Sequence, residues 1–386
     1  MKLASRFEDL GGSEIRAIVD RAQELEKGGV RVAHFEIGRP DFDTPTVAKV
    51  ATKKALDEGK VHYGPNAGFG PLRVAITNHL NERYRTSLNA EQLLVTNGAV
   101  EAVFLSLLAV VDPGTEVLIP EPSWPYYPSM VRLMGAVPRL IPSSFDSTYS
   151  PSLEALRQSV NRHTRALLLN SPNNPTGAVL DPASRAQLAE FAQEHDLLVV
   201  ADEVYDRIRF GGPAGSIVNL PGMSERTALI GAFSKTYSMT GWRVGYVALP
   251  PALFRPALLA HTYINTSINT FVQYGALAAL EQAEPDVELM LLEYQKRRDV
   301  ALARLQAMPG VQCATTHGGF FVFPRLIDYP DDRQLAHRLL EEAYVATVPG
   351  SSFGPSGASH LRISFSCDMD SLINGLDQME AWLRAQ

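Results

Sequence analysis

The chain has 386 residues, which is more than one small core requires and suggests about two domains. Hydrophobic residues make up 45% of it and charged residues 20%, as is ordinary for a globular enzyme. The net charge of −7 argues against a nucleic-acid partner, because a phosphate backbone attracts positive charge. The longest strongly apolar stretch lies near residues 102–111 and is too short to span a membrane. We therefore expect a cytoplasmic protein without a membrane partner.

The cysteines and histidines give no support for a metal centre. Cys313 and Cys367 are the two cysteines, and they supply neither a disulfide framework nor a set of metal ligands. The nine histidines include no His-x-x-x-His pair, which a helical zinc site would use. We expect a site without a metal.

The first ninety residues alternate between helices and irregular loops. Residues 13–27 show helical apolar spacing behind Ser13 as the N-cap. A short strand at 32–37 runs into a loop rich in glycine, proline and aspartate, and Pro45 then opens a helix that reaches about Glu58. A second irregular loop precedes a helix that ends at about Tyr84.

From residue 93 onward, strands alternate with helices, which predicts a mainly parallel sheet with helices on both faces. The predicted strands are 93–96, 116–119, 136–141, 166–170, 197–201, 228–233 and 244–249. The predicted helices are 99–111, 129–134, 152–159, 182–194 and 288–306. Strands within 310–324 and 346–365, with a helix at 333–343, predict a smaller α+β unit. We expect a large domain at 46–282 and a small domain built from 1–45 and 283–386.

Polar and aromatic residues follow the predicted strands, where an open parallel sheet binds its ligands. These residues are Asn97-Gly98, Trp124, Asn174, Asp202, Tyr205 and Lys235. They offer a helix start for an anion, an aromatic plate, an amide, a carboxylate, a phenol and an amine. A lysine at the end of a buried strand is made nucleophilic toward a carbonyl when desolvation lowers its pKa. The set predicts a site for a flat, phosphorylated ring that carries an aldehyde.

Several motifs, in this order, resemble the class I/II aminotransferases of fold type I (aspartate aminotransferase-like), which use pyridoxal 5′-phosphate (PLP). The motifs are Gly38-Arg-Pro-Asp-Phe, Asn173-Asn-Pro-Thr-Gly, Ala201-Asp-Glu-Val-Tyr, Ser234-Lys, Val348-Pro-Gly and Leu361-Arg-Ile-Ser. The resemblance implies an α/β fold with a mainly parallel mixed sheet flanked by helices, plus a smaller α+β domain. It also implies amino-group transfer between an L-amino acid and a 2-oxo acid, through an internal aldimine and pyridoxamine phosphate.

The same resemblance implies roles for the residues around the cofactor ring. Lys235 matches the lysine that forms the internal aldimine. Asp202 matches the carboxylate that pairs with the pyridine nitrogen and keeps the ring an electron sink. Tyr205 and Asn174 match the pair that hydrogen-bonds the phenolate oxygen, and Trp124 matches the aromatic residue stacked on the ring.

The phosphate and the substrate carboxylate have their own matches. The cofactor phosphate would sit on the backbone N–H groups of a helix start, together with a hydroxyl and a guanidinium. The matching residues are Gly98, Ala99, Val100, Ser234 and Arg243. Arg362 matches the arginine that clamps the substrate α-carboxylate, near Gly38, Asn174 and Trp124. Tyr63 matches a tyrosine that reaches the phosphate in the neighbouring subunit, so the resemblance implies a homodimer with shared sites.

Departures from the family pattern lie mostly around the substrate. Ala232 stands where a serine or threonine is common, so one phosphate hydroxyl is missing. Val100 stands where some enzymes for acidic substrates have a lysine that meets the distal carboxylate. No other arginine suits that role, so we expect neutral amino donors to be preferred over aspartate and glutamate. Glu36, Phe69 and Gly70-Pro71 are also unusual within their motifs.

Two other classes of function were weighed. The same residues would support β-elimination, as in a C–S lyase, or cyclisation in specialised metabolism, because these reactions share the carbanion step. A non-catalytic sensor fused to a DNA-binding domain would need an additional basic domain ahead of Gly38, and we expect none.

Overall fold

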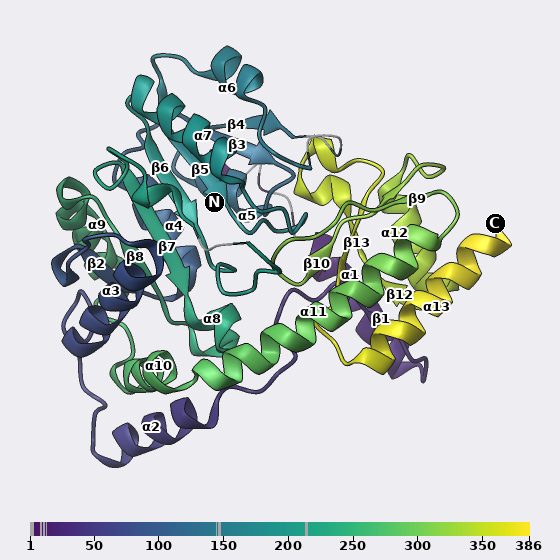
Figure 1. The fold of residues 1–386 in the computed structure, drawn as a ribbon, viewed down its shortest axis with the longest axis horizontal. Coiled ribbons are helices and arrows are strands. Elements are labelled where there is room, and N and C mark those ends of the chain that lie inside the picture. The colour runs from purple at the N-terminus through teal and green to yellow at the C-terminus, as the bar shows by residue number, and fades with distance from the viewer. Residues whose placement is uncertain are drawn as a thin grey trace.

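The computed structural model describes residues 4–7, 10, 12, 14–143, 145, 148–212 and 215–386, which form a large and a smaller body side by side (Figure 1). The expected N-cap Ser13 lies outside the described residues, and helix α1 covers Glu14–Lys27. Within the described ranges, every helix is too short or too polar to cross a bilayer.

A seven-stranded sheet forms the centre of the large body, in the order β2-β8-β7-β6-β5-β3-β4. Its strands are β2 (Leu93–Thr96), β3 (Glu116–Glu121), β4 (Val137–Pro142), β5 (Thr164–Asn170), β6 (Leu198–Asp202), β7 (Thr227–Ala232) and β8 (Gly245–Ala248). Strand β8 runs antiparallel to β2 and β7, whereas the other neighbours pair in parallel. The predicted α/β fold with a mainly parallel sheet is confirmed.

Helices cover both faces of this sheet, as alternation along buried strands requires. They are α3 (Gly70–Tyr84), α4 (Gly98–Leu108), α5 (Tyr126–Leu133), α6 (Leu153–Ser159), α7 (Pro182–Glu194) and α9 (Pro251–Asn265). Helices α2 (Thr46–Asp57) and α10 (Thr270–Gln282) pack against each other, and α10 also packs against α3. Within β6, Val199 packs in the cluster that contains Phe191 of α7. The next residue, Val200, packs in the cluster that contains Val103 of α4 and Ala257 of α9.

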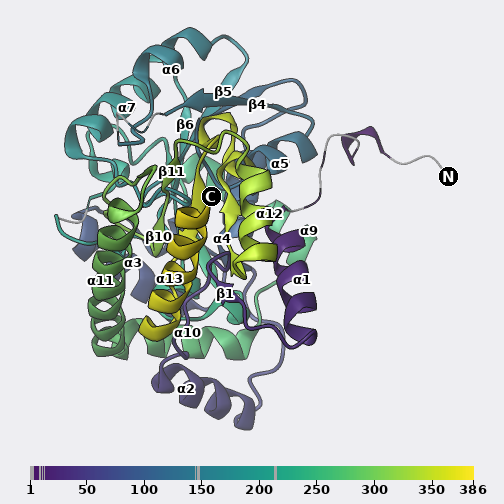
Figure 2. The ribbon, with the colours of Figure 1, turned by 90° about the vertical axis from the view of Figure 1, so that its right-hand side faces the viewer.

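The smaller body contains the helices α1, α12 and α13 together with two strand pairs, β1-β12 and β11-β9, and a three-stranded sheet in the order β10-β14-β13 (Figure 2). Its remaining elements are β1 (Ala33–His34), β9 (Val311–Gln312), β10 (Phe321–Val322), β11 (Arg325–Leu326), α12 (Asp332–Glu342), β12 (Val345–Ala346), β13 (Val348–Pro349), β14 (Leu361–Ser364) and α13 (Met369–Ala385). The strands within 32–37, 310–324 and 346–365 are shorter than expected, because each strand finds a partner over only two to four residues. Helix α13 was not expected from the sequence.

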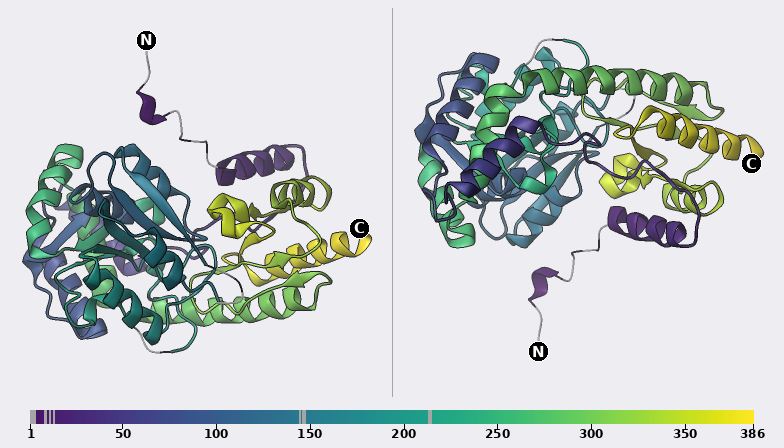
Figure 3. Two further views of the ribbon diagram at one scale, coloured as in Figure 1. Left: turned by 90° about the horizontal axis from the view of Figure 1, so that it is seen from above. Right: turned by 90° about the horizontal axis from the view of Figure 1, so that it is seen from below.

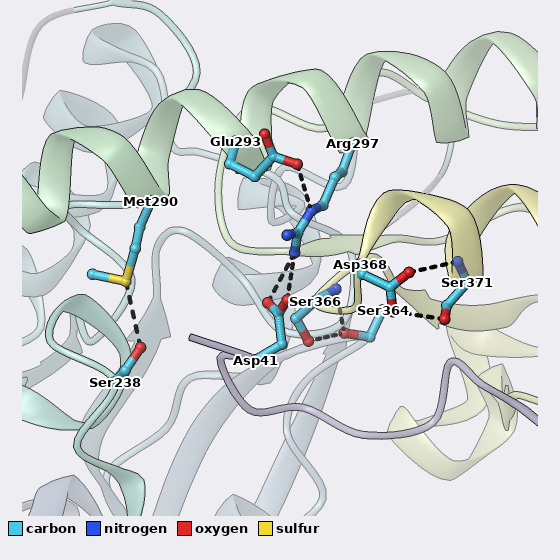
Figure 4. A network of polar contacts seen from close by, with 9 residues as sticks. All are labelled: Asp41, Ser238, Met290, Glu293, Arg297, Ser364, Ser366, Asp368 and Ser371. Atoms are coloured by element: carbon cyan, nitrogen blue, oxygen red, sulfur yellow. Dashed lines mark hydrogen bonds and ion pairs between the residues drawn. The ribbon is translucent and has the colours of Figure 1, made fainter. Parts of the chain in front are cut away.

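Helix α11 (Glu284–Ala307) runs along both bodies (Figure 3). On it, Arg297 donates from Nη1 to the carboxylate oxygens of Asp41 at 2.8 and 2.9 Å and from Nε to Glu293 at 3.1 Å (Figure 4). Ser238, which follows β7 in the chain, donates to the sulfur of Met290 at 3.4 Å. From this arrangement we propose the division into a large domain at 46–282 and a small domain from 1–45 and 283–386.

Candidate active site

A cavity of about 320 Å³ lies beyond the carboxyl ends of the parallel strands. All but two of the residues expected in the site line it: Gly38, Ala99, Val100, Trp124, Asn174, Asp202, Tyr205, Ser234, Lys235, Arg243 and Arg362. Gly98 lies directly behind the wall of the cavity, next to Arg243. Tyr63 does not line this subunit's cavity, and its side chain is 88% exposed.

Lys235 reaches the cavity from a short helix, α8 (Phe233–Thr236), and not from the end of strand β7 as expected. Its Nζ donates a hydrogen bond to the carbonyl oxygen of Gly38 at 2.7 Å. The pKa of Lys235 is lowered to about 8, mainly by burial and also by the charges of Arg362 and Arg243, whereas Asp202 opposes this shift. Near neutral pH a useful fraction of this amine is therefore unprotonated and able to act as a nucleophile or base.

Asp202 is the last residue of β6, and its side chain is almost completely buried. The hydroxyl of Tyr127 donates to Oδ2 at 2.7 Å, and the N–H of Val204 lies 3.3 Å from Oδ1. Burial raises the pKa of Asp202 to about 6, although these hydrogen bonds and Lys235 oppose the rise. A buried carboxyl group on the cavity wall, with no arginine or lysine bound to it among the described residues, fits a protonated ring nitrogen.

Arg362 lies on β14 and is 2% exposed. Its guanidinium sits over the rings of Phe321 and Phe353, 4.8 and 5.2 Å from their centroids. It donates to Asn174 Oδ1 at 3.2 Å and to the carbonyl oxygen of Glu36, while its Nε has no partner in the described part of the chain. Burial lowers the pKa of Arg362 to about 10. A buried guanidinium that has no carboxylate partner among the described residues fits the anionic group of a ligand.

The start of α4 forms an anion-binding turn. Gly98 has φ +74°, and a Cβ there would lie 2.4 Å from Nη2 of Arg243, so the turn requires glycine. Arg243 donates from Nη2 to the carbonyl oxygen of Asn97 at 3.2 Å. The first N–H groups of the helix lack intrahelical partners, and with Arg243 they fit a phosphate.

Several residues of the cavity were missed by the sequence analysis. Asn170 ends β5; it donates to the backbone oxygen of Asp202 and accepts from the N–H of Asn174, both at 2.9 Å. Its position directly after an apolar strand could have identified Asn170 as a residue of the cavity from the sequence alone. Ile15 of α1 and Tyr126 of α5 also line the cavity, and Tyr126 stacks on Trp124 with ring centroids 4.4 Å apart.

The amine, the carboxyl group and the helix start thus lie together at the strand ends of an α/β sheet, an arrangement that suits a PLP enzyme of fold type I. The family model for aminotransferase class I and II matches residues 31–377, and the chain belongs to that family. It is an enzyme that uses PLP to transfer an amino group between an amino acid and a 2-oxo acid. The lyase alternative is not favoured.

Relatives that are named for different substrates have similar sequence identities to this chain. The probable aspartate/prephenate aminotransferase of Aquifex aeolicus is 37% identical over 98% of both chains. The aromatic-amino-acid aminotransferase 2 of Thermococcus litoralis is also 37% identical, over 100% of this chain and 99% of its own. The structure of Thermus thermophilus aspartate aminotransferase with maleate has a TM-score of 0.94 and 34% identity, covering 99% of each chain.

Proposed function

We propose that Lys235, Asp202 and Arg362 carry out amino-group transfer in this cavity, with the cofactor phosphate on the Gly98–Val100 turn. The proposal rests on one observation above all. An amine with a pKa of about 8, a buried carboxyl group and a buried guanidinium line the same small cavity, and no carboxylate of the described chain pairs with the guanidinium.

PLP, when bound, supplies the electron-accepting ring that stabilises negative charge at the substrate Cα. Asp202 holds the proton on the ring nitrogen, and Tyr127 fixes the carboxylate that does so. Arg362, together with Asn174, holds the substrate α-carboxylate. The neutral amine of Lys235 accepts the proton from Cα, and its hydrogen bond to Gly38 orients it beforehand.

The remaining wall of the cavity indicates the class of side chain that the substrate carries. Ile15, Val100, Trp124 and Tyr126 supply apolar surface there. The cations among the described lining residues are Lys235, Arg243 and Arg362, and each already has a role above. A distal carboxylate would lose its water without gaining a cation, which costs at least a few kcal/mol. We therefore propose aliphatic and aromatic amino acids as the preferred donors.

A panel of amino acids tests both the reaction and this preference. Incubated without an acceptor, phenylalanine or leucine should give one equivalent of 2-oxo acid per site, with kcat/KM above that of aspartate. Val100→Lys should raise kcat/KM for aspartate by about tenfold, since one charge-assisted hydrogen bond contributes about 1.5 kcal/mol or more. Val137 on β4 is exposed to a similar extent, and Val137→Lys should leave kcat/KM unchanged for aspartate and for phenylalanine or leucine. Aspartate as the best donor of the parent enzyme would overturn the preference.

We also propose a homodimer in which Tyr63 enters the partner's site. Exposed apolar side chains lie on the loop after α2 and on α9: Val61, Tyr63, Leu259, Tyr263 and Ile264. The two segments lie side by side, since Asn66 Nδ2 donates to Thr262 Oγ1 at 3.0 Å. Exposed apolar patches of this kind mark protein interfaces.

The cytoplasmic location expected from the sequence stays a prediction.

Tyr63→Phe should weaken PLP binding by about tenfold at most, because it removes one hydrogen bond to a charged group and leaves the ring. The measurement is the PLP dissociation constant of the apoenzyme, with sedimentation to establish the oligomeric state. Tyr263→Phe removes a hydroxyl of similar exposure and should leave PLP affinity unchanged. A fully active monomer would rule out the shared site.

A further inference from the structure

Glu101 lies one turn inside α4 and is buried, although no role has been assigned to it. Its Oε2 accepts the backbone N–H of Asn97 at 2.6 Å. Its Oε1 lies 2.8 Å from Nδ1 of His261 and accepts from Nδ2 of Asn265 at 2.5 Å. Both partners belong to α9, and His261 is fully buried. A helix more than 150 residues away along the chain thus holds this carboxylate in place.

The backbone group that Glu101 binds belongs to the anion-binding turn. The carbonyl oxygen of Asn97 accepts from Arg243 at 3.2 Å, so this first residue of the turn is held at both its N–H and its C=O group. On the other side, the hydroxyl of Thr96 donates to the carbonyl oxygen of Gly98 at 3.0 Å. A Cβ at Gly245 would lie 2.5 Å from the carbonyl carbon of Gly98. The turn therefore has little room to move once Glu101 is in place.

Glu101 is held in its ionised form. Burial favours the neutral acid, but hydrogen bonds from His261, Asn97 and Asn265 outweigh it and keep the pKa of Glu101 below its ordinary value. A carboxylate this close to a phosphate site opposes anion binding electrostatically, so direct attraction does not explain its presence. It can help only by fixing geometry or by stabilising the helix start, where acidic residues are favourable.

We propose that Glu101, clamped by His261 and Asn265, is a positioning residue that preorganises the Asn97–Gly98 turn for the cofactor phosphate. This inference rests on the proposed assignment of that turn to the phosphate. Preorganised donors bind an anion more tightly because they need no ordering when the ligand arrives.

Pyridoxal, which lacks the phosphate, separates this role from general stability. The ratio of the pyridoxal and PLP dissociation constants, from spectroscopic titration of the apoenzyme, measures what the phosphate contributes. Glu101→Met keeps the length of the side chain and removes both acceptors. We expect the ratio to fall about tenfold in this variant, with pyridoxal binding changed less than about twofold. Glu101→Gln retains one acceptor for the N–H of Asn97 and should recover most of the loss.

Two reference variants make the outcomes distinct. Glu116 is another buried carboxylate in an ion pair, and it lies at the amino end of β3, away from the carboxyl ends of the strands. Glu116→Gln should therefore leave the ratio of the two dissociation constants unchanged. Arg243→Ala should lower the ratio of the two dissociation constants. An unchanged ratio in this variant would mean that the phosphate does not bind at this turn, and it would overturn the proposed site as well. A lowered ratio in Arg243→Ala with an unchanged one in Glu101→Met would overturn only the positioning role.

A purely stabilising role predicts a different pattern. It would weaken PLP and pyridoxal equally in Glu101→Met and lower the Tm of the apoenzyme, and this result would contradict the proposal. Equal losses in the Met and Gln variants would also count against it, because the argument depends on an acceptor. If Glu101→Met does not fold, Asn265→Ala gives the same measurement from α9, with a smaller expected fall of about threefold. No change in that variant would then overturn the proposal.

Discussion

Lys235→Ala should bind PLP without a covalent bond and show no measurable turnover, because it removes the amine that bonds the aldehyde and moves the Cα proton. Borohydride treatment followed by mass analysis should find one labelled site per subunit in the parent and none in the variant. Lys49→Ala is the matched control, since Lys49 pairs with Asp43 and lies away from the cavity lining. A reducible linkage that persists in Lys235→Ala would reject the assignment.

The same experiment has a pH dependence with a definite sign. Only the neutral amine attacks an aldehyde, and the pKa of Lys235 is lowered, mainly by burial, to about 8 from its ordinary value of 10.5. In the apoenzyme, the rate of covalent attachment should therefore increase as the pH rises through about 8 and level off above it. An increase that continues to about pH 10.5 would show an amine that is not desolvated.

Asp202→Asn should retain bound PLP but slow the half-reaction with an amino acid by about 100-fold or more, equivalent to about 2.7 kcal/mol. The substitution keeps the shape of the side chain and removes the negative charge that holds the proton on the ring nitrogen. Rapid-mixing absorbance measurements with a saturating donor give the rate of this step.

The control is Glu121→Gln. Glu121 also ends a strand of the sheet and is buried, but its carboxyl group accepts from Ser356 and does not line the cavity. Glu121→Gln keeps the shape of this side chain, as Asp202→Asn does at its own position. Its half-reaction should match that of the parent. A rate for Asp202→Asn within about threefold of the parent, or about 0.7 kcal/mol, would mean that Asp202 is not the partner of the ring nitrogen.

The cofactor side of the cavity was largely predictable, because it depends on local features of the sequence. Apolar runs locate the buried strands, and parallel strands bring their carboxyl ends to one edge of the sheet. Asp202 and Asn174 could be placed at that edge from their distance to the preceding strand alone. Errors of one or two residues, such as Lys235 lying in a short helix, did not move a side chain out of the cavity.

The short strands of the smaller body were predicted less well. Residues 346–365 contain several apolar residues that suggested continuous strands, but pairing partners exist only for β12, β13 and β14. A strand extends only as far as a neighbour meets its N–H and C=O groups, and that depends on chain segments far away. Helix α13 was overlooked although its apolar residues follow helical spacing: Leu372, Leu376 and Met379 are all buried.

The sequence by itself determined the fold class and the kind of cofactor, because strand periodicity and residue order are local properties. Only the tertiary structure decided which side chains complete the cavity and how they ionise. Ile15 and Val100 line the same cavity, and His261 pairs with Glu101 next to the proposed phosphate turn, although no spacing along the chain brings these residues together. The pKa of Lys235 near 8 likewise depends on burial and on charges contributed by distant strands, so it exists only in the folded protein.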